Sequence, residues 1–489
     1  MKITKKQIFI ITSFATILFL LMFSALIAPL FIVDESWNFM NIYKMVNGGL
    51  LYKDNNVIDM PIFFIIGKKL FQLFGSNIVT FRMYNIGIFF IKFLLIYFIL
   101  KKMGVNKINA IAYIFLYLAF DIQLIYSSAN YNQLSMIFVL LGILGFVTLK
   151  NKKYYNLFQG LIIFCVFFTK QTYGIYYALA IVSFEISENG FFCKKFWKNQ
   201  FMKGISFLIL TLFSIAAILN KGIFLDFINM CFGSVIEFGS KNFVMEWESQ
   251  LNFVPLIIMV IGYYFISKMN KSNIELNKNN KFITYIALFM TLNVYPIFND
   301  YHIKMNYVFY FLMFVTYIDV LVVQEIYEDL TKSIVIITLI ITIFIFVQEL
   351  YLLKMILDDD YMLFEKQNAF YGTYLDAEEY KKMETVKKYI KEREKEGINV
   401  IIPEYNASLY MVQLNKNNRQ FDMLLQGNLG YDGINKSIEE ISKMKNTEFL
   451  IFTNDDEHHY QTPQEIIDYI KQNFEKKEEL TDYTIYKSN

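Results

Sequence analysis

The sequence predicts a polytopic α-helical membrane protein with about eleven transmembrane helices and a small C-terminal α/β domain. Of its 489 residues 55% are apolar, and the mean hydropathy is +0.36, whereas soluble domains are about half apolar. A helix needs about twenty apolar residues to cross the hydrocarbon core, and runs of this kind follow one another up to residue 352. Beyond it the composition turns charged and polar, which predicts a domain outside the membrane.

The first apolar run follows a basic start, MKITKK, which is typical of a signal peptide. Its apolar core has spanning length and no small-residue cleavage site follows, so we expect an uncleaved anchor. The predicted spans lie near 7–30, 79–100, 108–126, 132–149, 154–169, 171–188, 203–220, 252–267, 282–298, 303–323 and 333–352. The fifth and sixth are separated only by TKQT at 169–172, and merging them would move every later loop across the membrane.

The distribution of Lys and Arg predicts the orientation, because these residues are retained on the cytoplasmic side. Every short segment placed inside by eleven spans is basic: 1–6, 101–107, 150–153, 193–199 and 268–281. The short outer segments carry only Lys170 and Lys304. We therefore expect the N-terminus inside and the C-terminal domain outside. The heavy use of Lys, Asn, Ile, Phe and Tyr is typical of an AT-rich bacterial genome, so the membrane is expected to be a bacterial cytoplasmic membrane.

Two domains follow from this reading: a transmembrane domain over 1–357 and a soluble extracytoplasmic domain over 358–489. The tail alternates helix-like and strand-like stretches, with helices expected in DAEEYKKMETVKKYIKEREKEG, INKSIEEISKMKN and PQEIIDYIKQNF and strands in INVIIP, TEFLIFT and YTIYK. Two outer loops, 31–78 and 221–251, are long and mix apolar with polar residues. This mixture predicts helices lying in the membrane interface.

Composition also excludes several classes of protein. The net charge of +2 gives no argument for nucleic-acid binding. Cys165, Cys193 and Cys231 lack the spacing of a disulfide or zinc framework. The stretch NDDEHHY at 454–460 places two His beside three acids, but adjacent His side chains seldom converge on one ion, so we interpret it as a solvated loop.

Several charged residues of the predicted outer face could form one reaction site. They are Asp34 and Glu35 after the first span, Arg82 at the start of the second, Lys170 between the fifth and sixth, and His302 with Lys304 before the tenth. Cations stabilise a phosphate, while a carboxylate accepts a proton from an attacking hydroxyl. This combination favours chemistry on an anionic lipid head group.

Each of these residues also has a simpler interpretation. The two acids are equally consistent with solvated loop charge. Lys170 lies in a very short turn within an apolar stretch, which favours function, although a snorkelling lysine would also occur there. Arg82 could anchor a helix end, His302 could be a packed or capping residue, and Lys304 could bind lipid phosphate.

The order of motifs resembles a known family. A DE pair directly follows the first span, then come GGLLYKD, IDMP, LFG at 73–75 and the Arg of FRMYN. This order resembles the first external loop of the GT-C glycosyltransferases, closest to small bacterial members of the protein O-mannosyltransferase and aminoarabinose lipid A transferase branch, and TKQTYG resembles another of their motifs. The resemblance is strongest over 1–180 and looser up to 352.

The resemblance implies a GT-C-like enzyme that transfers a sugar from a polyprenyl-phosphate donor to an acceptor on the outer face. The acceptor would be a protein, a teichoic-type polymer, a polysaccharide or a lipid. Asp34 would be the general base of an inverting displacement and Glu35 a neighbour that shapes the site. Arg82 and Lys170 would bind the donor phosphate, and His302 with Lys304 would contact the donor from a late external loop.

One departure concerns the loop before the fourth span, where some members carry an acid. Here the chain reads SSANYNQLSM, with Asn130 and Asn132. We therefore expect no metal and no other cofactor, since a divalent ion lacks support.

Two rival classes of function stay open. A transporter or flippase of lipid-linked sugars would place ionisable residues near the middle of the membrane, for which Lys92 and Asp121 are candidates; a non-catalytic scaffold would tolerate replacement of Asp34 and Lys170.

Overall fold

The computed structural model describes most of the chain between residues 34 and 488. The described stretches are 28–30, 34–126, 128–241, 244–245, 250–251, 253–269, 274–295, 297–322, 361–366, 368–412, 421–453 and 462–488, with a few single positions elsewhere. Most of the first predicted span at 7–30, the last at 333–352, and the two His of 454–460 fall outside these stretches.

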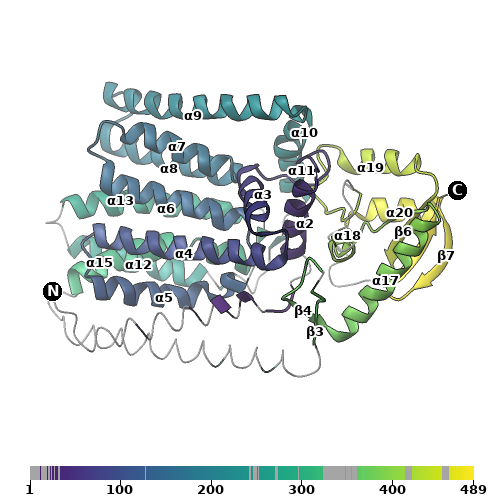
Figure 1. Cartoon of the computed structure of the whole chain (residues 1–489). Helices are drawn as coiled ribbons and strands as arrows, with labels where there is room; N and C mark the ends of the chain where they lie inside the picture. The colour runs from purple at the N-terminus through teal and green to yellow at the C-terminus, as the bar shows by residue number, and fades with distance from the viewer. Residues whose placement is uncertain are drawn as a thin grey trace.

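Long, roughly parallel helices form the larger part of the molecule (Figure 1). They are α4 (Ile78–Lys102), α5 (Lys107–Tyr126), α6 (Tyr131–Leu149), α7 (Tyr155–Phe167), α8 (Gln171–Asn189), α9 (Lys194–Asn220), α12 (Phe253–Met269), α13 (Ile274–Met290) and α15 (Tyr307–Val322). Among the described helices, α4, α6 and α9 are long and apolar enough to cross a membrane. The protein is therefore a mainly helical, membrane-associated protein.

These nine helices lie at nine of the eleven predicted spans. The break at TKQT is confirmed, because α7 ends at Phe167 and α8 begins at Gln171. One boundary was wrong: the ninth span was expected over 282–298, but α13 runs from Ile274 to Met290 and is followed by a 3-10 turn, η3 (Thr291–Val294). The polar sequence IELNKNNK looked like a loop, yet a helix that extends beyond the apolar core has no need of apolar residues there.

The two long outer loops fold into short helices at one end of the bundle. They are α2 (Asp34–Val46) and α3 (Ile62–Phe74) from the first loop, and α10 (Phe224–Ile228), the π-helix η1 (Asn229–Gly233) and α11 (Ser234–Lys241) from the second. In Figure 1 α2, α3 and α10 run across the direction of the long helices. The expected helices of these loops are therefore present, while their place in the membrane interface stays a prediction.

At the opposite end lie the turns that carry the basic segments. Lys150 after α6 donates a hydrogen bond to Asn279 of α13 (2.5 Å), and Lys281 of α13 pairs with Glu188 of α8 (2.8 Å). Among the described residues, the basic segments around 150 and 281 therefore lie at the same end, in agreement with the predicted topology.

The C-terminal unit is built on a mixed sheet with the strand order β5-β6-β8-β7. Its strands are β5 (Asn399–Ile401), β6 (Thr447–Phe452), β7 (Glu475–Leu480) and β8 (Tyr483–Lys487), and its helices are α17 (Ala377–Lys395), α18 (Ala407–Met411), α19 (Gly433–Ser442) and α20 (Gln464–Asn473). β5 and β6 are parallel, and the other two pairs are antiparallel. All three predicted strands and all three predicted helices are confirmed.

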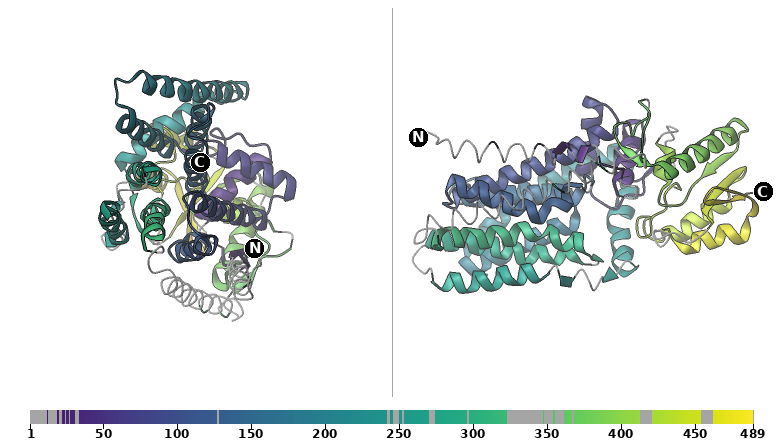
Figure 2. Two further views of the ribbon diagram at one scale, coloured as in Figure 1. Left: turned by 90° about the vertical axis from the view of Figure 1, so that its left-hand side faces the viewer. Right: turned by 90° about the horizontal axis from the view of Figure 1, so that it is seen from below.

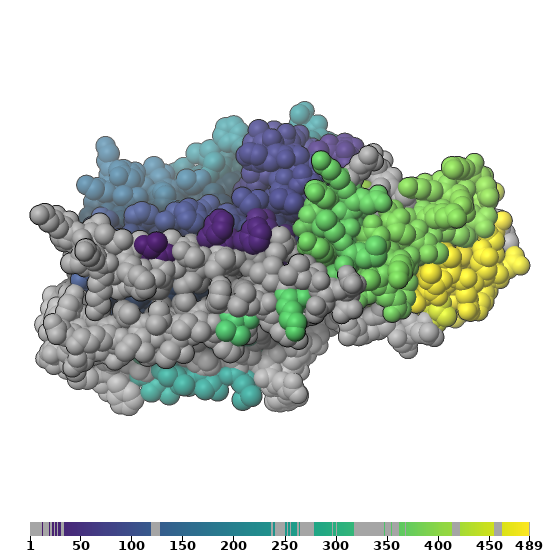
Figure 3. All heavy atoms as spheres, turned by 60° about the horizontal axis from the view of Figure 1, so that its bottom comes forward, coloured from purple at the N-terminus to yellow at the C-terminus, as the bar shows by residue number. Residues whose placement is uncertain are grey.

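A hairpin of β3 (Tyr361–Leu363) and β4 (Tyr374–Asp376) joins this unit to the bundle. The amide of Ile78 donates to Ala369 (2.8 Å), and the rings of Phe39 and Phe370 lie 5.3 Å apart. One hydrophobic cluster runs from the long helices through α2 and α3 into this hairpin. Figure 2 shows the unit beyond one end of the bundle, and in Figure 3 its green surface adjoins the dark blue and purple surface of the early part of the chain.

Candidate active site

The candidate site lies where the bundle meets the C-terminal unit. The helices α4, α6 and α8 all begin at this end, so the positive ends of their dipoles face it. Such an environment favours an anion. The site is completed by the first residues of α2, the loop that leads into α3, and the short helix α14 (Asp300–Met305).

The two adjacent acids of α2 have opposite environments. The Asp34 side chain is exposed, and no described residue forms a hydrogen bond or ion pair with its carboxylate. Protein atoms surround it closely enough that partial desolvation raises its pKa. Glu35 is 5% exposed and is held by the guanidinium of Arg82. Asp34 is thus the acid that is available to a substrate.

Arg82 joins three parts of the chain. Its Nε and Nη2 donate to the two oxygens of Glu35 at 2.7 and 2.8 Å. The same group donates to the carbonyls of Leu26 (2.9 Å), Ala28 (2.7 Å) and Pro29 (3.1 Å). A guanidinium has five N–H donors, and these five contacts use them all. The geometry favours a structural role over the predicted binding of the donor phosphate.

Lys170, unlike Arg82, does not use all of its hydrogen-bond donors within the described structure. It occupies the N-cap position of α8, and its ammonium donates to Asn132 Oδ1 (2.6 Å) and lies 4.9 Å from the centre of the Tyr131 ring. No described carboxylate lies within ion-pair distance of it. Desolvation lowers its pKa, while the charge of Asp59 opposes this effect. Lys170 is therefore a half-buried cation with donors left for an anionic ligand.

Asp59, which the sequence analysis did not single out, lies beside Lys170. Its side chain is 3% exposed, and its Oδ2 has no hydrogen-bond partner among the described residues. Burial raises the pKa of this carboxyl to about 6, while the charge of Lys170 and hydrogen bonding by Tyr131 oppose the rise. A buried acid beside a half-buried cation is typical of functional sites. Its position in the IDMP motif was the only cue in the sequence.

The backbone around Asp59 is fixed by three other segments. The hydroxyl of Tyr52 donates to the Asp59 carbonyl (3.1 Å), and the thiol of Cys231 donates to the same oxygen (3.7 Å). Gln171 donates to the carbonyl of Ile58 (3.0 Å). Tyr52 itself has a φ of 72°, a conformation that costs a non-glycine residue free energy and persists only where surrounding contacts hold it. Asp59 is thereby held in a set position.

His302 lies on α14 and is neutral. Asn299 Oδ1 accepts a hydrogen bond from the His302 amide (3.0 Å) and lies 2.7 Å from His302 Nδ1. Because that oxygen accepts only, Nδ1 carries the proton and Nε2 is left as an acceptor. Burial and the charge of Lys170 lower the pKa of His302 to about 3. A neutral imidazole with an acceptor nitrogen fits a sugar hydroxyl better than the predicted phosphate.

The remaining polar residues come from α14 and from the turn before α6. Asn130 donates to the hydroxyl of Tyr301 and caps α6 through Gln133 (3.0 Å). Lys304 is half-buried on α14. The structure thus brings together Asp34, Lys170 and His302 of the predicted site, adds Asp59, and assigns Glu35 and Arg82 to its scaffold.

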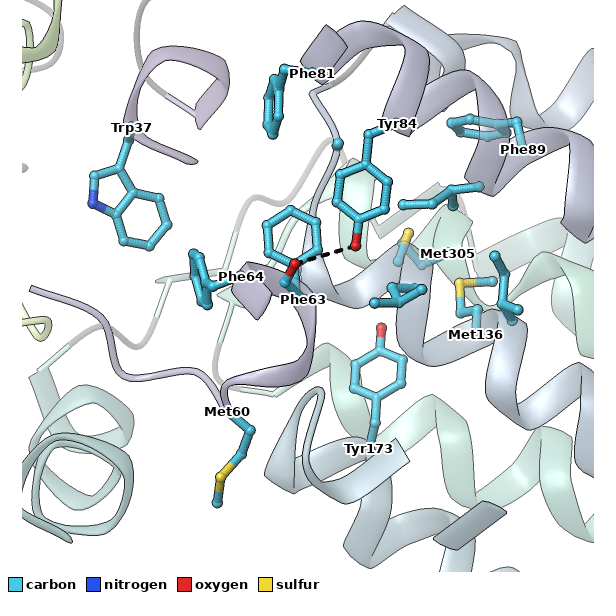
Figure 4. Packing of buried hydrophobic residues seen from close by; sticks show 14 of the residues in the cluster. Trp37, Met60, Phe63, Phe64, Phe81, Tyr84, Phe89, Met136, Tyr173 and Met305 are labelled. Atoms are coloured by element: carbon cyan, nitrogen blue, oxygen red, sulfur yellow. Dashed lines mark hydrogen bonds between the residues drawn. The ribbon is translucent and has the colours of Figure 1, made fainter. Parts of the chain in front are cut away.

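Aromatic and sulfur-containing side chains close the site on the bundle side. Figure 4 shows Tyr84 of α4 and Tyr173 of α8 with their hydroxyls pointing toward one another, beside Met136 and Met305. Tyr84 donates to the carbonyl of Phe63 (3.3 Å). In the part of the chain that the structure describes, no group of three or more His, Cys, Asp and Glu is placed to hold a metal ion.

Comparison with known proteins does not assign the chain to a family. No known protein family matches this chain, and no curated protein is significantly similar to it.

Proposed function

We propose that this protein is a membrane glycosyltransferase of the GT-C type, which moves a sugar from a polyprenyl-phosphate donor to an acceptor on the outer face of a bacterial membrane. One observation carries the proposal: a carboxylate and a cation that have no ion-pair partner among the described residues, Asp34 and Lys170, both neighbour Tyr131 at one end of an apolar bundle. Glycosyl transfer from a lipid phosphate needs this pair of groups.

The proposed reaction is a single displacement at the anomeric carbon. The acceptor oxygen forms the new bond to that carbon while Asp34 takes its proton, and the bond between the carbon and the phosphate oxygen breaks. The phosphate leaves with the electron pair, and Lys170 together with the helix N-termini stabilises its charge. A leaving group held in this way needs little acid catalysis. One displacement inverts the anomeric configuration.

The polyprenyl chain would lie along apolar helix surface. Residues of α4 that face outward from the bundle, among them Met83, Phe90 and Ile91, are 45 to 52% exposed, which suits contact with lipid. The donor phosphate would then reach Lys170 from the interface while the acceptor approaches the exposed Asp34.

The proposal is tested in cells that lack the gene and produce either the wild-type protein, Asp34→Asn or Asp226→Asn. Asp226 on α10 is a control acid at the same end of the bundle. Mass spectrometry of envelope glycans should show a product that wild type and Asp226→Asn restore, while Asp34→Asn lowers it at least about 100-fold, the usual contribution of a general base. Full restoration by Asp34→Asn at equal protein levels would refute the assignment.

A specific observation favours transport of lipid-linked sugars as the second candidate. Lys92 is fully buried within α4; it donates to Gln133 Oε1 (3.3 Å) and lies 4.1 Å from the centre of the Phe89 ring. An ionisable residue inside a spanning helix is a functional candidate. The two classes separate in detergent solution, where there are no leaflets: an enzyme still consumes its donor there, whereas a flippase leaves it intact.

A further inference from the structure

Asp59 is a buried acid for which the proposed reaction has no use. The base is Asp34, which is exposed, whereas Asp59 is 3% exposed and no described residue bonds to its Oδ2. A buried carboxylate costs free energy unless it is paired, and the described structure contains no ion pair between Asp59 and Lys170. The negative charge of Asp59 therefore offsets the positive charge of Lys170, which would hold the phosphate, although the two groups form no ion pair.

The two phosphate species of the reaction differ in charge. The donor is a phosphodiester, which carries one negative charge. Once the sugar has left, the lipid carries a phosphomonoester, whose second ionisation lies near pH 6, so that it bears nearly two charges above neutral pH. Lys170 supplies one positive charge, and Asp59 beside it supplies one negative charge. A second charge on the ligand is thus repelled by Asp59, whose carboxylate already offsets the charge of Lys170.

We propose that Asp59 makes the phosphate site selective for the monoanionic phosphodiester of the donor over the phosphomonoester of the spent carrier, and so promotes release of the product. This inference rests on the proposed function. Its geometric basis is the fixed loop: Tyr52, Cys231 and Gln171 hold the backbone at 58–59, and the carboxylate that this backbone carries is buried beside Lys170.

The selectivity should depend on pH. Burial raises the pKa of Asp59 to about 6, so the group is neutral in acid and ionised at pH 8. The titratable groups that face it are Tyr52, Tyr131, Lys170 and Cys231. Burial raises the pKa of Tyr52 and Cys231, so neither ionises in this range. His302, which neighbours Lys170, also stays neutral because its pKa lies near 3.

The test uses the full-length protein in lipid nanodiscs and two probes, farnesyl phosphate and its methyl diester. Binding of each is measured at pH 5 and pH 8 for wild type, Asp59→Asn, Lys170→Gln and the control Asp226→Asn. At pH 8 wild type and Asp226→Asn should prefer the diester about tenfold, the effect of one like charge in a partly buried site. Asp59→Asn should bind the monoester about tenfold more tightly and lose the preference. A preference that Asp59→Asn retains would overturn the inference.

The wild-type protein alone provides a second test should Asp59→Asn fail to fold. The charge of the diester is constant between pH 5 and pH 8, so its affinity should fall severalfold as Asp59 ionises; a constant affinity would overturn the inference. The two proposals fail differently. If both probes bind through Lys170 with no effect of Asp59, only the selectivity is refuted, whereas binding of neither probe through Lys170 refutes the donor site as well.

Discussion

At the scale of single residues, the adjacent acids Asp34 and Glu35 have different roles. Asp34 and Glu35 are consecutive, but an α-helix turns by about 100° per residue, so their side chains leave α2 in different directions. One meets solvent and the other meets Arg82 in the protein interior. The pair is therefore a substrate-facing acid followed by a structural one.

This difference predicts unequal effects on stability. Glu35→Ala leaves a buried guanidinium without its carboxylate, which costs about 3–5 kcal/mol of unfolding free energy. Asp34→Ala removes an exposed acid that pairs with no described residue, and it should change stability by about 0.5 kcal/mol or less. Denaturation of both purified variants in detergent, with wild type beside them, measures the two values. Equal losses would contradict the separate roles.

The same scale shows why part of the site escaped prediction. Asp34 and Lys170 stand out in the sequence because they are charges next to apolar runs. Asp59 lies in a polar loop, and only folding places it beside Lys170, more than a hundred residues away. Likewise the five hydrogen bonds of Arg82 go to residues about fifty positions earlier in the chain. No pattern in the sequence predicts these hydrogen bonds.

At the scale of elements, the turn between α7 and α8 depends on close backbone packing. A Cβ added at Gly174 would lie 2.4 Å from the Cα of Phe167, which is backbone and cannot move without shifting a helix. Gly174 is one turn beyond Lys170 on α8. The glycine of TKQTYG thus allows the two helices to approach closely at the point where Lys170 is placed.

Gly174→Ala should therefore push α7 and α8 apart. We expect a loss of about 1–3 kcal/mol of stability, the usual cost of overpacking, and weaker binding of farnesyl phosphate. Gly87→Ala on α4 is the matched control, because no atom lies within 4 Å of its added Cβ; it should be neutral or slightly stabilising, since alanine is the better helix former. Equal behaviour of the two variants would exclude the packing explanation.

The elements that could be predicted are those whose apolar residues are buried in the structure. β6 is buried along its whole length, and its apolar run TEFLIFT predicted it. β7, with the sequence EKKEEL, is almost wholly exposed at the edge of the sheet. Charged edge strands resist pairing with other chains, but they lose the alternation of apolar and polar residues that would mark them as strands, so β7 was missed.

At the scale of the whole molecule, the predicted boundary at 357 does not separate two independent cores. The hydroxyls of Ser36 on α2 and Ser408 on α18 lie 2.6 Å apart, and Phe39 packs on Phe370. The helix that carries Asp34 is thus braced by the C-terminal unit. Composition detects the change from membrane to water at this point, but it cannot detect packing across it.

The last prediction concerns the orientation of the protein in the membrane. In a variant with Cys165, Cys193 and Cys231 replaced by alanine, new cysteines are placed at Lys443 after α19 and at Lys153 between α6 and α7, both exposed. The basic turns should lie inside the cell. A membrane-impermeant maleimide should therefore label Lys443→Cys in intact cells and Lys153→Cys only after permeabilisation, with the cysteine-free protein as the blank. The reverse pattern would place Asp34 and Lys170 in the cytoplasm, where the donor and acceptor of the proposed reaction could not meet on the outer face.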